Sequence, residues 1–295
     1  MRITSADGRN FPWTGRLPVD EVIPAVCAAL STSLSAVLQA PPGAGKTTHV
    51  PLALLNEPWL AGSRIIVLEP RRLATRSVAA RMSQLLNERA GETVGYRVRR
   101  DTKVGPRTRI EVVTEGILTR MIQSDPTLEG IGLLIFDEFH ERSIHADTGL
   151  ALALHSRTLV RPDLRILVMS ATLDGARVSG LLEDAPVITS TGRTYPVELH
   201  YSTRTDIRAM PAAVASKVMQ ALSDDDGDVL VFLPGGAEIR RVTSLLAGRV
   251  GGNVSIEQLY GDLPQDRQDA AILPSRRGAR KVVLSGFHDE TGDAA

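Results

Sequence analysis

The chain consists of short apolar segments that alternate with segments of helical periodicity. The apolar segments are continuous in valine, isoleucine and leucine rather than alternating with polar residues, as in strands that are buried on both faces of a parallel sheet. Helical segments such as 72–87 and 208–222 supply the crossovers between them. The pattern predicts an α/β fold with doubly wound parallel sheets. The candidate strands are residues 35–38, 64–68, 109–113, 132–136, 165–169, 185–189, 228–233, 254–259 and 281–284.

The alternation is interrupted once, where threonine, serine, glycine and proline gather near residues 190–197. A chain of 295 residues is long enough for two domains of ordinary size. We therefore expect an N-terminal domain at residues 1–190, a linker at 191–197 and a second domain at 198–295.

Composition adds three constraints. The formal net charge is +0, so no global charge demands an acidic partner, but between Arg64 and Arg109 twelve basic residues face four acidic ones. This stretch is either a solvated basic face or a track for a nucleic-acid backbone. Cys27 is the only cysteine, which excludes an intrachain disulfide and a cysteine-based metal cage. The sequence shows no signal-peptide pattern and no apolar run of membrane-spanning length, so we expect a cytoplasmic protein without a membrane partner.

The strongest chemical signal is the segment APPGAGKTT at residues 40–48, which follows a predicted strand and precedes a helical stretch. A strand–loop–helix of this kind is the context of a phosphate-binding loop. The glycines let backbone N–H groups converge on phosphate oxygens, and the helix N-terminus favours an anion. The lysine reaches the outer phosphates, and the threonine hydroxyl can bind Mg²⁺. The candidate nucleotide-binding residues are Gly43, Ala44, Gly45, Lys46, Thr47 and Thr48.

A second signal is the pair of carboxylates Asp137 and Glu138 at the end of the predicted strand 132–136. Ligands of open α/β sheets bind at the carboxyl ends of the strands. We expect Asp137, with Thr47 and Glu138, to surround a Mg²⁺ ion, and Glu138 to activate the attacking water. Taken singly, residues 40–48 could be an ordinary glycine-rich turn, and Asp137 with Glu138 could be an acidic turn that caps the strand. Together and in this order they predict a site that binds and hydrolyses a nucleoside triphosphate such as ATP.

The two motifs, followed by Ser170-Ala171-Thr172 after another strand, resemble the DEAH/RHA branch of superfamily 2 ATP-dependent helicases. Phe139 stands where that family usually has alanine. The N-terminal segment and the double-proline loop are most similar to the bacterial HrpB-type subgroup. Further segments resemble other motifs of the family. Residues 69–77 are similar to its motif Ia, 114–120 to motif Ib, and 192–198 to its linker strand. Residues 231–239 are similar to motif IV, and 259–268 to the segment that follows it.

The resemblance implies two RecA-like domains, ATP and Mg²⁺ as cofactors, and a nucleic acid, single-stranded RNA, as the partner. The residues themselves leave RNA against DNA open, and they leave protein partners unknown. In the family, His140 would join Lys46, Asp137 and Glu138 in catalysis, and Ser170 and Thr172 would couple hydrolysis to domain movement. The residues that the resemblance places on the nucleic-acid backbone are Arg71, Arg72, Thr114, Glu115 and Gly116.

The sequence departs from the family near its end. The family continues past residue 285 with motifs V and VI, but residues 286–295 read GFHDETGDAA. We expect an incomplete second domain with a divergent ending from about 286, weak ATP hydrolysis and no unwinding, since an arginine on the transferred phosphate contributes about 10³–10⁵ in rate. Two alternatives stay open: a P-loop NTPase without a nucleic-acid substrate, and a non-catalytic remnant that binds nucleotide or RNA.

Overall fold

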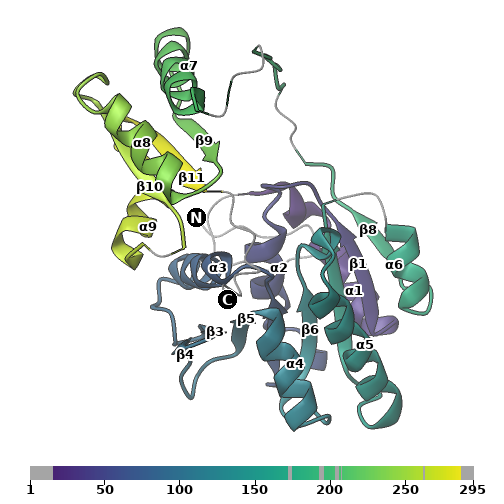
Figure 1. The fold of residues 1–295 in the computed structure, drawn as a ribbon. Helices are drawn as coiled ribbons and strands as arrows, with labels where there is room; N and C mark the ends of the chain where they lie inside the picture. The colour runs from purple at the N-terminus through teal and green to yellow at the C-terminus, as the bar shows by residue number, and fades with distance from the viewer. Residues whose placement is uncertain are drawn as a thin grey trace. The chain divides into compact units, whose positions relative to one another are not determined.

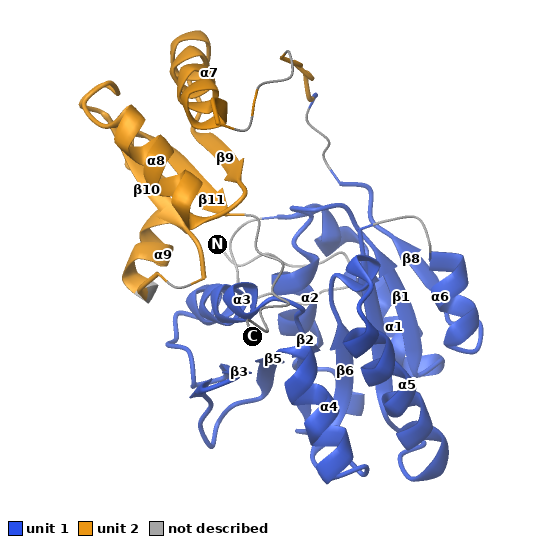
Figure 2. Ribbon diagram, in the orientation of Figure 1, with its two compact units in different colours: residues 1–196 blue, residues 197–295 orange. Residues whose placement is uncertain are grey.

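The computed structural model describes residues 16–171, 175–192, 196–202, 206, 208–261 and 263–286. They divide into two compact units, unit 1 within residues 1–196 and unit 2 within residues 197–295 (Figure 2). The division falls between Pro196 and Val197, inside the segment at which we expected a linker. Thr172 and most of the divergent ending, residues 287–295, lie outside the described residues.

Unit 1 contains an eight-stranded sheet in the order β4-β3-β5-β2-β6-β7-β1-β8, in which only β4 runs antiparallel to its neighbour (Figure 1). The other neighbouring strands of this sheet are parallel, and parallel neighbours must be joined by crossover connections, which are usually helices. The strands are β1 (Ser35–Gln39), β2 (Arg64–Leu68), β3 (Val94–Val98), β4 (Asp101–Lys103), β5 (Ile110–Val113), β6 (Ile131–Phe136), β7 (Arg165–Ser170) and β8 (Val187–Thr189).

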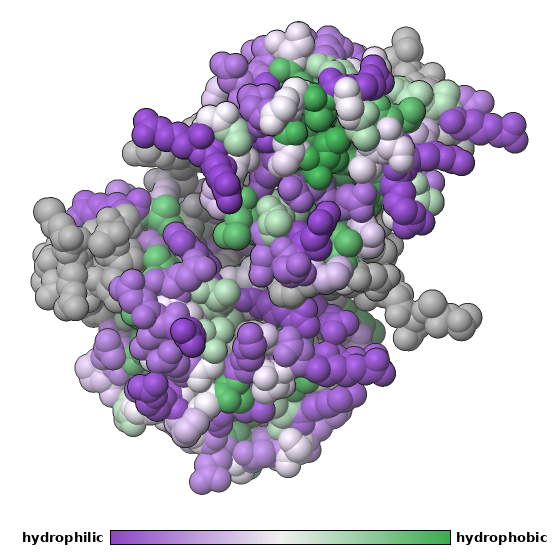
Figure 3. Space-filling model, turned by 90° about the vertical axis from the view of Figure 1, so that its left-hand side faces the viewer, coloured by the Kyte–Doolittle hydropathy of each residue, from purple (hydrophilic) through white to green (hydrophobic). Residues whose placement is uncertain are grey.

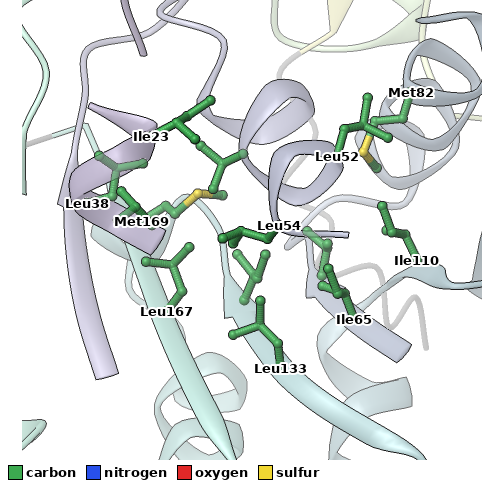
Figure 4. Packing of buried hydrophobic residues seen from close by; sticks show 14 of the residues in the cluster. Ile23, Leu38, Leu52, Leu54, Ile65, Met82, Ile110, Leu133, Leu167 and Met169 are labelled. Carbon is green, nitrogen blue, oxygen red and sulfur yellow. The ribbon is translucent and has the colours of Figure 1, made fainter. Parts of the chain in front are cut away.

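Helices pack on both faces of this sheet. On one face, Leu38, Leu133 and Leu167 pack with residues of α1, α2 and α3, among them Leu54 and Met82 (Figure 4). The alternate strand residues form a second core with the helices of the other face. The continuous apolar strands inside the sheet are therefore buried on both faces, as their sequences predict, whereas the edge strand β8 is not, with Val187 41% exposed. The helices are α1 (Ile23–Thr32), α2 (Lys46–Leu54) and α3 (Arg72–Leu85) on the first face and α4 (Glu115–Ser124), α5 (Ile144–Leu159) and α6 (Gly175–Leu181) on the second.

Short 3-10 turns complete unit 1: η1 (Pro18–Glu21), η2 (Pro58–Leu60) and η3 (Phe139–Glu141). The sequence pattern did not predict β3 and β4. Their segment mixes glycine and arginine with apolar residues, so it lacks the continuous apolar run of the central strands. Gly95 in β3 is needed for this pairing, because a Cβ there would lie 2.4 Å from the Lys103 carbonyl oxygen.

Unit 2 contains a three-stranded parallel sheet in the order β10-β11-β9. Its core joins one sheet face to two helices, through residues such as Val218, Ile239 and Leu284. On the other face of β9, Leu230 and Phe232 are 56% and 57% exposed. Figure 3 shows apolar side chains gathered on the surface of this unit. The elements are α7 (Met210–Asp224), β9 (Val229–Leu233), α8 (Gly236–Leu246), β10 (Val254–Leu259), α9 (Gln265–Ile272) and β11 (Arg280–Gly286).

In unit 2, the expectation that every apolar strand is buried on both faces is also wrong, for β9 and β10. Their apolar sequences are like those of unit 1, but α7 and α8 pack on a single face of the sheet. Within the described part of the chain, no helix has the length and apolar character needed to cross a membrane.

Candidate active site

The turn between β1 and α2 has the backbone of a phosphate-binding loop. Gly43 and Gly45 have φ angles of +76° and +91°, which side-chain-bearing residues rarely adopt. Gly45 is the residue before α2, so the first N–H groups of that helix lie at the loop. The loop is anchored to the sheet, because the Ala40 N–H donates to the Ser170 carbonyl at 3.0 Å. The backbone is shaped to receive an anion.

An N-terminal turn supports this loop from beneath. The Val19 N–H in η1 donates to the Ala44 carbonyl at 3.1 Å, and a Cβ on Gly45 would lie 2.5 Å from Leu17 Cδ1. In the same turn, Asp20 Oδ1 lies 2.7 Å from His49 Nδ1, with both side chains buried. The Asp20–His49 pair was not predicted from the sequence. No local sequence motif predicts this pair, because the two residues are 29 positions apart in the chain.

The lysine of the loop and the proposed water-activating carboxylate contact each other. Lys46 Nζ lies 2.8 Å from Glu138 Oε1, and Lys46 is only 3% exposed. The two residues come from different strand–loop connections, β1–α2 and β6–η3. They meet because the carboxyl ends of parallel strands lie along one edge of the sheet. A buried ammonium held by one carboxylate can exchange that partner for a phosphate oxygen without becoming unpaired.

Two further carboxyl groups are buried beside this pair. Burial, followed by the charge of Glu138, raises the pKa of Asp137 to about 6 against the opposing effects of the Thr47 hydroxyl and Lys46. Burial, followed by the charges of Asp137, Glu138 and Glu141, raises the pKa of Glu69 to about 9. Glu69 follows β2 and is 5% exposed. In the sequence, Glu69 is the first residue of the segment 69–77 that resembles motif Ia, and nothing local in the sequence indicates its burial.

Some oxygens of these carboxyl groups are not used in hydrogen bonds within the part of the chain that the structure describes, and they are suited to bind a cation. Asp137 Oδ1 accepts from the Glu138 N–H at 2.8 Å. Asp137 Oδ2 and Glu69 Oε2 are buried and have no hydrogen-bond partner among the described residues. In the same part of the chain, no three His, Cys, Asp or Glu side chains form a metal cage. Asp137 with the Thr47 hydroxyl is instead the partial oxygen ligand set that suits Mg²⁺, which takes its other ligands from phosphates and water.

The turn that follows the carboxylates is strained and well connected. Glu138 has a φ of +48°, in the left-handed region that disfavours side chains. His140 Nδ1 lies 3.3 Å from Glu138 Oε2 and accepts a hydrogen bond from the Ala171 N–H at 3.3 Å. Ser170, which ends β7, is 6% exposed. The structure therefore brings His140 next to the Ser170-Ala171 segment, while Thr172 lies outside the described residues.

The residues predicted to bind nucleic acid follow β2 and β5, at the same edge of the sheet. Arg71 donates to Glu141 Oε1 at 2.7 Å, and Arg72 donates to the Arg99 carbonyl at 3.0 Å. Thr114 precedes α4, and Gly116 in its first turn has open space where a Cβ would be. The first backbone N–H groups of α4 therefore lie at an exposed helix N-terminus.

The chain is similar to known helicases. A profile of the DEAD/DEAH box helicase family matches residues 20–179. The ATP-dependent RNA helicase HrpB of Escherichia coli (strain K12) is 51% identical over 275 residues, which are 93% of this chain and 34% of HrpB. The pre-mRNA-splicing factor ATP-dependent RNA helicase prp22 of Schizosaccharomyces pombe is 36% identical over 282 residues, which are 93% of this chain and 24% of prp22.

Solved structures agree with the sequence matches. A crystal structure of the Escherichia coli DEAH/RHA helicase HrpB has a TM-score of 0.83 at 50% identity, over 92% of this chain and 34% of that one. A second structure, of the E. coli DExH-box NTPase HrpB, has a TM-score of 0.73 with the same coverage. The chain spans about a third of the length of HrpB and about a quarter of prp22.

Proposed function

The chain belongs to the DEAD/DEAH box helicase family, and we propose that it binds MgATP at the phosphate loop, hydrolyses it and couples hydrolysis to movement along single-stranded RNA. Membership confirms the resemblance to DEAH/RHA helicases, the α/β RecA-like fold and the enzyme family that the sequence implied. Because the chain spans 34% of HrpB, the activity, substrates and partners of the whole protein belong to the proposal.

The observation that carries the proposal is the contact between Lys46 and Glu138 beside buried Asp137. Loop residues 43–48 would hold the triphosphate, with Lys46 on its outer phosphates. Asp137 and Thr47 would hold Mg²⁺, with Glu138 at its edge. When bound, this ion neutralises charge on the phosphate oxygens. Once Lys46 contacts phosphate, the Glu138 carboxylate is released to accept a proton from the attacking water.

Coupling to movement is assigned to the contacts of His140. Its Nδ1 lies between Glu138 and the Ala171 N–H, so a change at the catalytic carboxylate would reach the Ser170-Ala171 segment; the coupling role of Thr172 stays part of the proposal. The names of the relatives support RNA as the substrate. Arg71, Arg72 and the N-terminus of α4, at Thr114, Glu115 and Gly116, are suited to phosphates, which carry no base sequence.

The hydrolysis part is tested with Glu138→Gln. We expect MgATP turnover to fall by about 10²–10⁴-fold while binding of a fluorescent ATP analogue persists, because the amide cannot take the proton from water. Glu129→Gln is the matched control, since Glu129 is exposed and precedes β6 at the opposite edge of the sheet. Equal turnover of Glu138→Gln and the unaltered chain would show that the chain binds nucleotide without catalysis.

For these 295 residues alone the proposal is slow hydrolysis without unwinding, because the sequence contains no run that resembles the arginine-bearing motif VI. ATP-driven strand separation by this chain would contradict that part. A P-loop NTPase without a nucleic-acid substrate would be supported instead if the Arg71→Ala/Arg72→Ala variant kept the RNA affinity and salt dependence of the unaltered chain.

A further inference from the structure

The turn that carries the catalytic carboxylate also contacts one of the residues assigned to the RNA backbone. Glu141, the last residue of η3, accepts a hydrogen bond from Arg71 at 2.7 Å. The two side chains are 35% and 63% exposed. Seventy residues of sequence separate them, so only the tertiary fold brings them together. An incoming RNA phosphate that binds Arg71 would therefore meet a carboxylate that already occupies the guanidinium.

The same turn has a second contact with the RNA-facing residues. Ser143 donates its hydroxyl hydrogen to Glu115 Oε1 at 2.6 Å, and its oxygen accepts from the Ala146 N–H at 2.9 Å. Ser143 therefore caps α5 and reaches the first turn of α4 at the same time. Residues 138–143 thus join the nucleotide site to both segments that are proposed to contact RNA.

The conformation of the turn suits a part that changes position. Its two ends, Glu138 and Arg142, have φ angles of +48° and +46°, a region that costs a residue with a side chain free energy. Arg142 is fixed by its bond to Asp147 at 2.8 Å and by the Phe139 ring at 5.4 Å. Inside the turn, the Glu141 N–H donates to the Glu138 carbonyl at 2.9 Å. Glu141 and Glu138 are therefore joined directly through the backbone of the turn.

We propose that Glu141 is a positioning residue that occupies Arg71 in place of an RNA phosphate, and that RNA binding displaces it and so reports RNA occupancy to Glu138. This rests on the proposed function. Carboxylate and phosphate use the same planar donors of a guanidinium, so they compete directly. The exchange is feasible because a solvent-exposed ion pair is weak.

The test is Glu141→Gln, assayed by fluorescence anisotropy with labelled single-stranded oligouridine at several salt concentrations, and by MgATP turnover with and without that RNA. We expect RNA to bind about two- to five-fold tighter, as loss of an exposed competing pair allows. We expect the ratio of RNA-stimulated to basal turnover to fall, because RNA no longer has a carboxylate to displace. A variant that is merely misfolded would bind RNA more weakly, which is the opposite sign.

Two comparisons make the result specific. In an Arg71→Ala background, Glu141→Gln should change the RNA affinity by less than the experimental error, because the competition requires the guanidinium. Glu129→Gln, the same charge change at the opposite edge of the sheet, should leave RNA affinity unaltered.

Equal RNA affinity of Glu141→Gln and the unaltered chain would overturn the inference and leave the proposed function standing. Tightening that persists in the Arg71→Ala background would also overturn it, as a general effect of charge. If the unaltered chain bound no RNA at any salt concentration, the RNA part of the proposed function would fail and this inference with it.

Discussion

The sheets of the two units are built from similar apolar strands but are covered differently. In unit 1, β1 is buried along its whole length, between the helices of two faces. In unit 2, β9 alternates between core residues and exposed Leu230 and Phe232. A continuous run of valine, isoleucine and leucine therefore indicates a strand, but the helices around it decide whether both of its faces are buried. The sheet with two covered faces is the one whose edge holds the candidate site.

The two units also differ in the partners of their buried lysines. Lys46 and Lys281 are 3% and 8% exposed. Lys281 Nζ is held by the backbone carbonyls of Ala271 and Leu273, which close the end of α9. Lys46 is held by the side-chain carboxylate of Glu138, a partner that a phosphate can replace. The first arrangement stabilises the fold, whereas the second leaves a cation available to a ligand.

The largest expected effect separates the two sheets directly. Phe136→Ala should lower the free energy of unfolding of unit 1 by about 3–5 kcal/mol, because the ring is fully buried. Phe232→Ala should cost less than about 1 kcal/mol, since 57% of that residue is already exposed. Urea unfolding followed by tryptophan fluorescence reports unit 1 through Trp59 in η2, and far-UV circular dichroism reports both units. Equal costs for the two variants would mean that β9 is covered in solution.

The second effect concerns the buried carboxyl groups of unit 1. The pKa of Glu69 rises from 4.5 to about 9 on folding, so the folded chain binds more protons than the unfolded chain between these values. Stability is therefore highest below the unfolded pKa and is lost as the pH rises. In the absence of nucleotide and Mg²⁺, the free energy of unfolding should therefore decline between about pH 5 and pH 8. Glu69→Gln should make this decline smaller by about 2–4 kcal/mol, because glutamine does not titrate.

Urea unfolding by tryptophan fluorescence at several pH values measures this effect. Phe232→Ala serves as the control, since its side chain does not titrate and it should keep the slope of the unaltered chain. If Glu69→Gln showed the same dependence of stability on pH as the unaltered chain, burial of Glu69 would not be the cause of that dependence.

The smallest effect compares two glycines that both have a positive φ angle. Gly45 in unit 1 and Gly248 in unit 2 have φ angles of +91° and +73°. Alanine at Gly248 meets no atom within 4 Å and should cost about 1 kcal/mol from the conformation alone. Alanine at Gly45 must also displace Leu17, so we expect about 2–3 kcal/mol. The measurement is urea unfolding of the two variants. An equal loss of unfolding free energy in the two variants would show that Leu17 moves away from residue 45 without a measurable energetic cost.

Much of the fold and of the candidate site could be predicted from local sequence. The strands of residues 64–68 and 254–259 match the structure at both ends, because a continuous apolar run is a local property. The phosphate loop was recognisable because Gly43, Gly45 and Lys46 are adjacent and each has a chemical reason for its place. The β3–β4 hairpin was missed, since its pairing depends on how closely Lys103 approaches Gly95 and not on an apolar pattern.

The sequence by itself determined the α/β class, the phosphate loop and the carboxylates at the end of β6, since each is encoded in a few consecutive residues. Tertiary structure alone decided which sheet faces are covered, that Glu69 is buried beside Asp137, that Asp20 pairs with His49 under the loop, and that Glu141 occupies Arg71. These features join residues far apart in the chain. Their energies depend on desolvation and on the distance between charges, which exist only once the strands have brought their carboxyl ends to one edge.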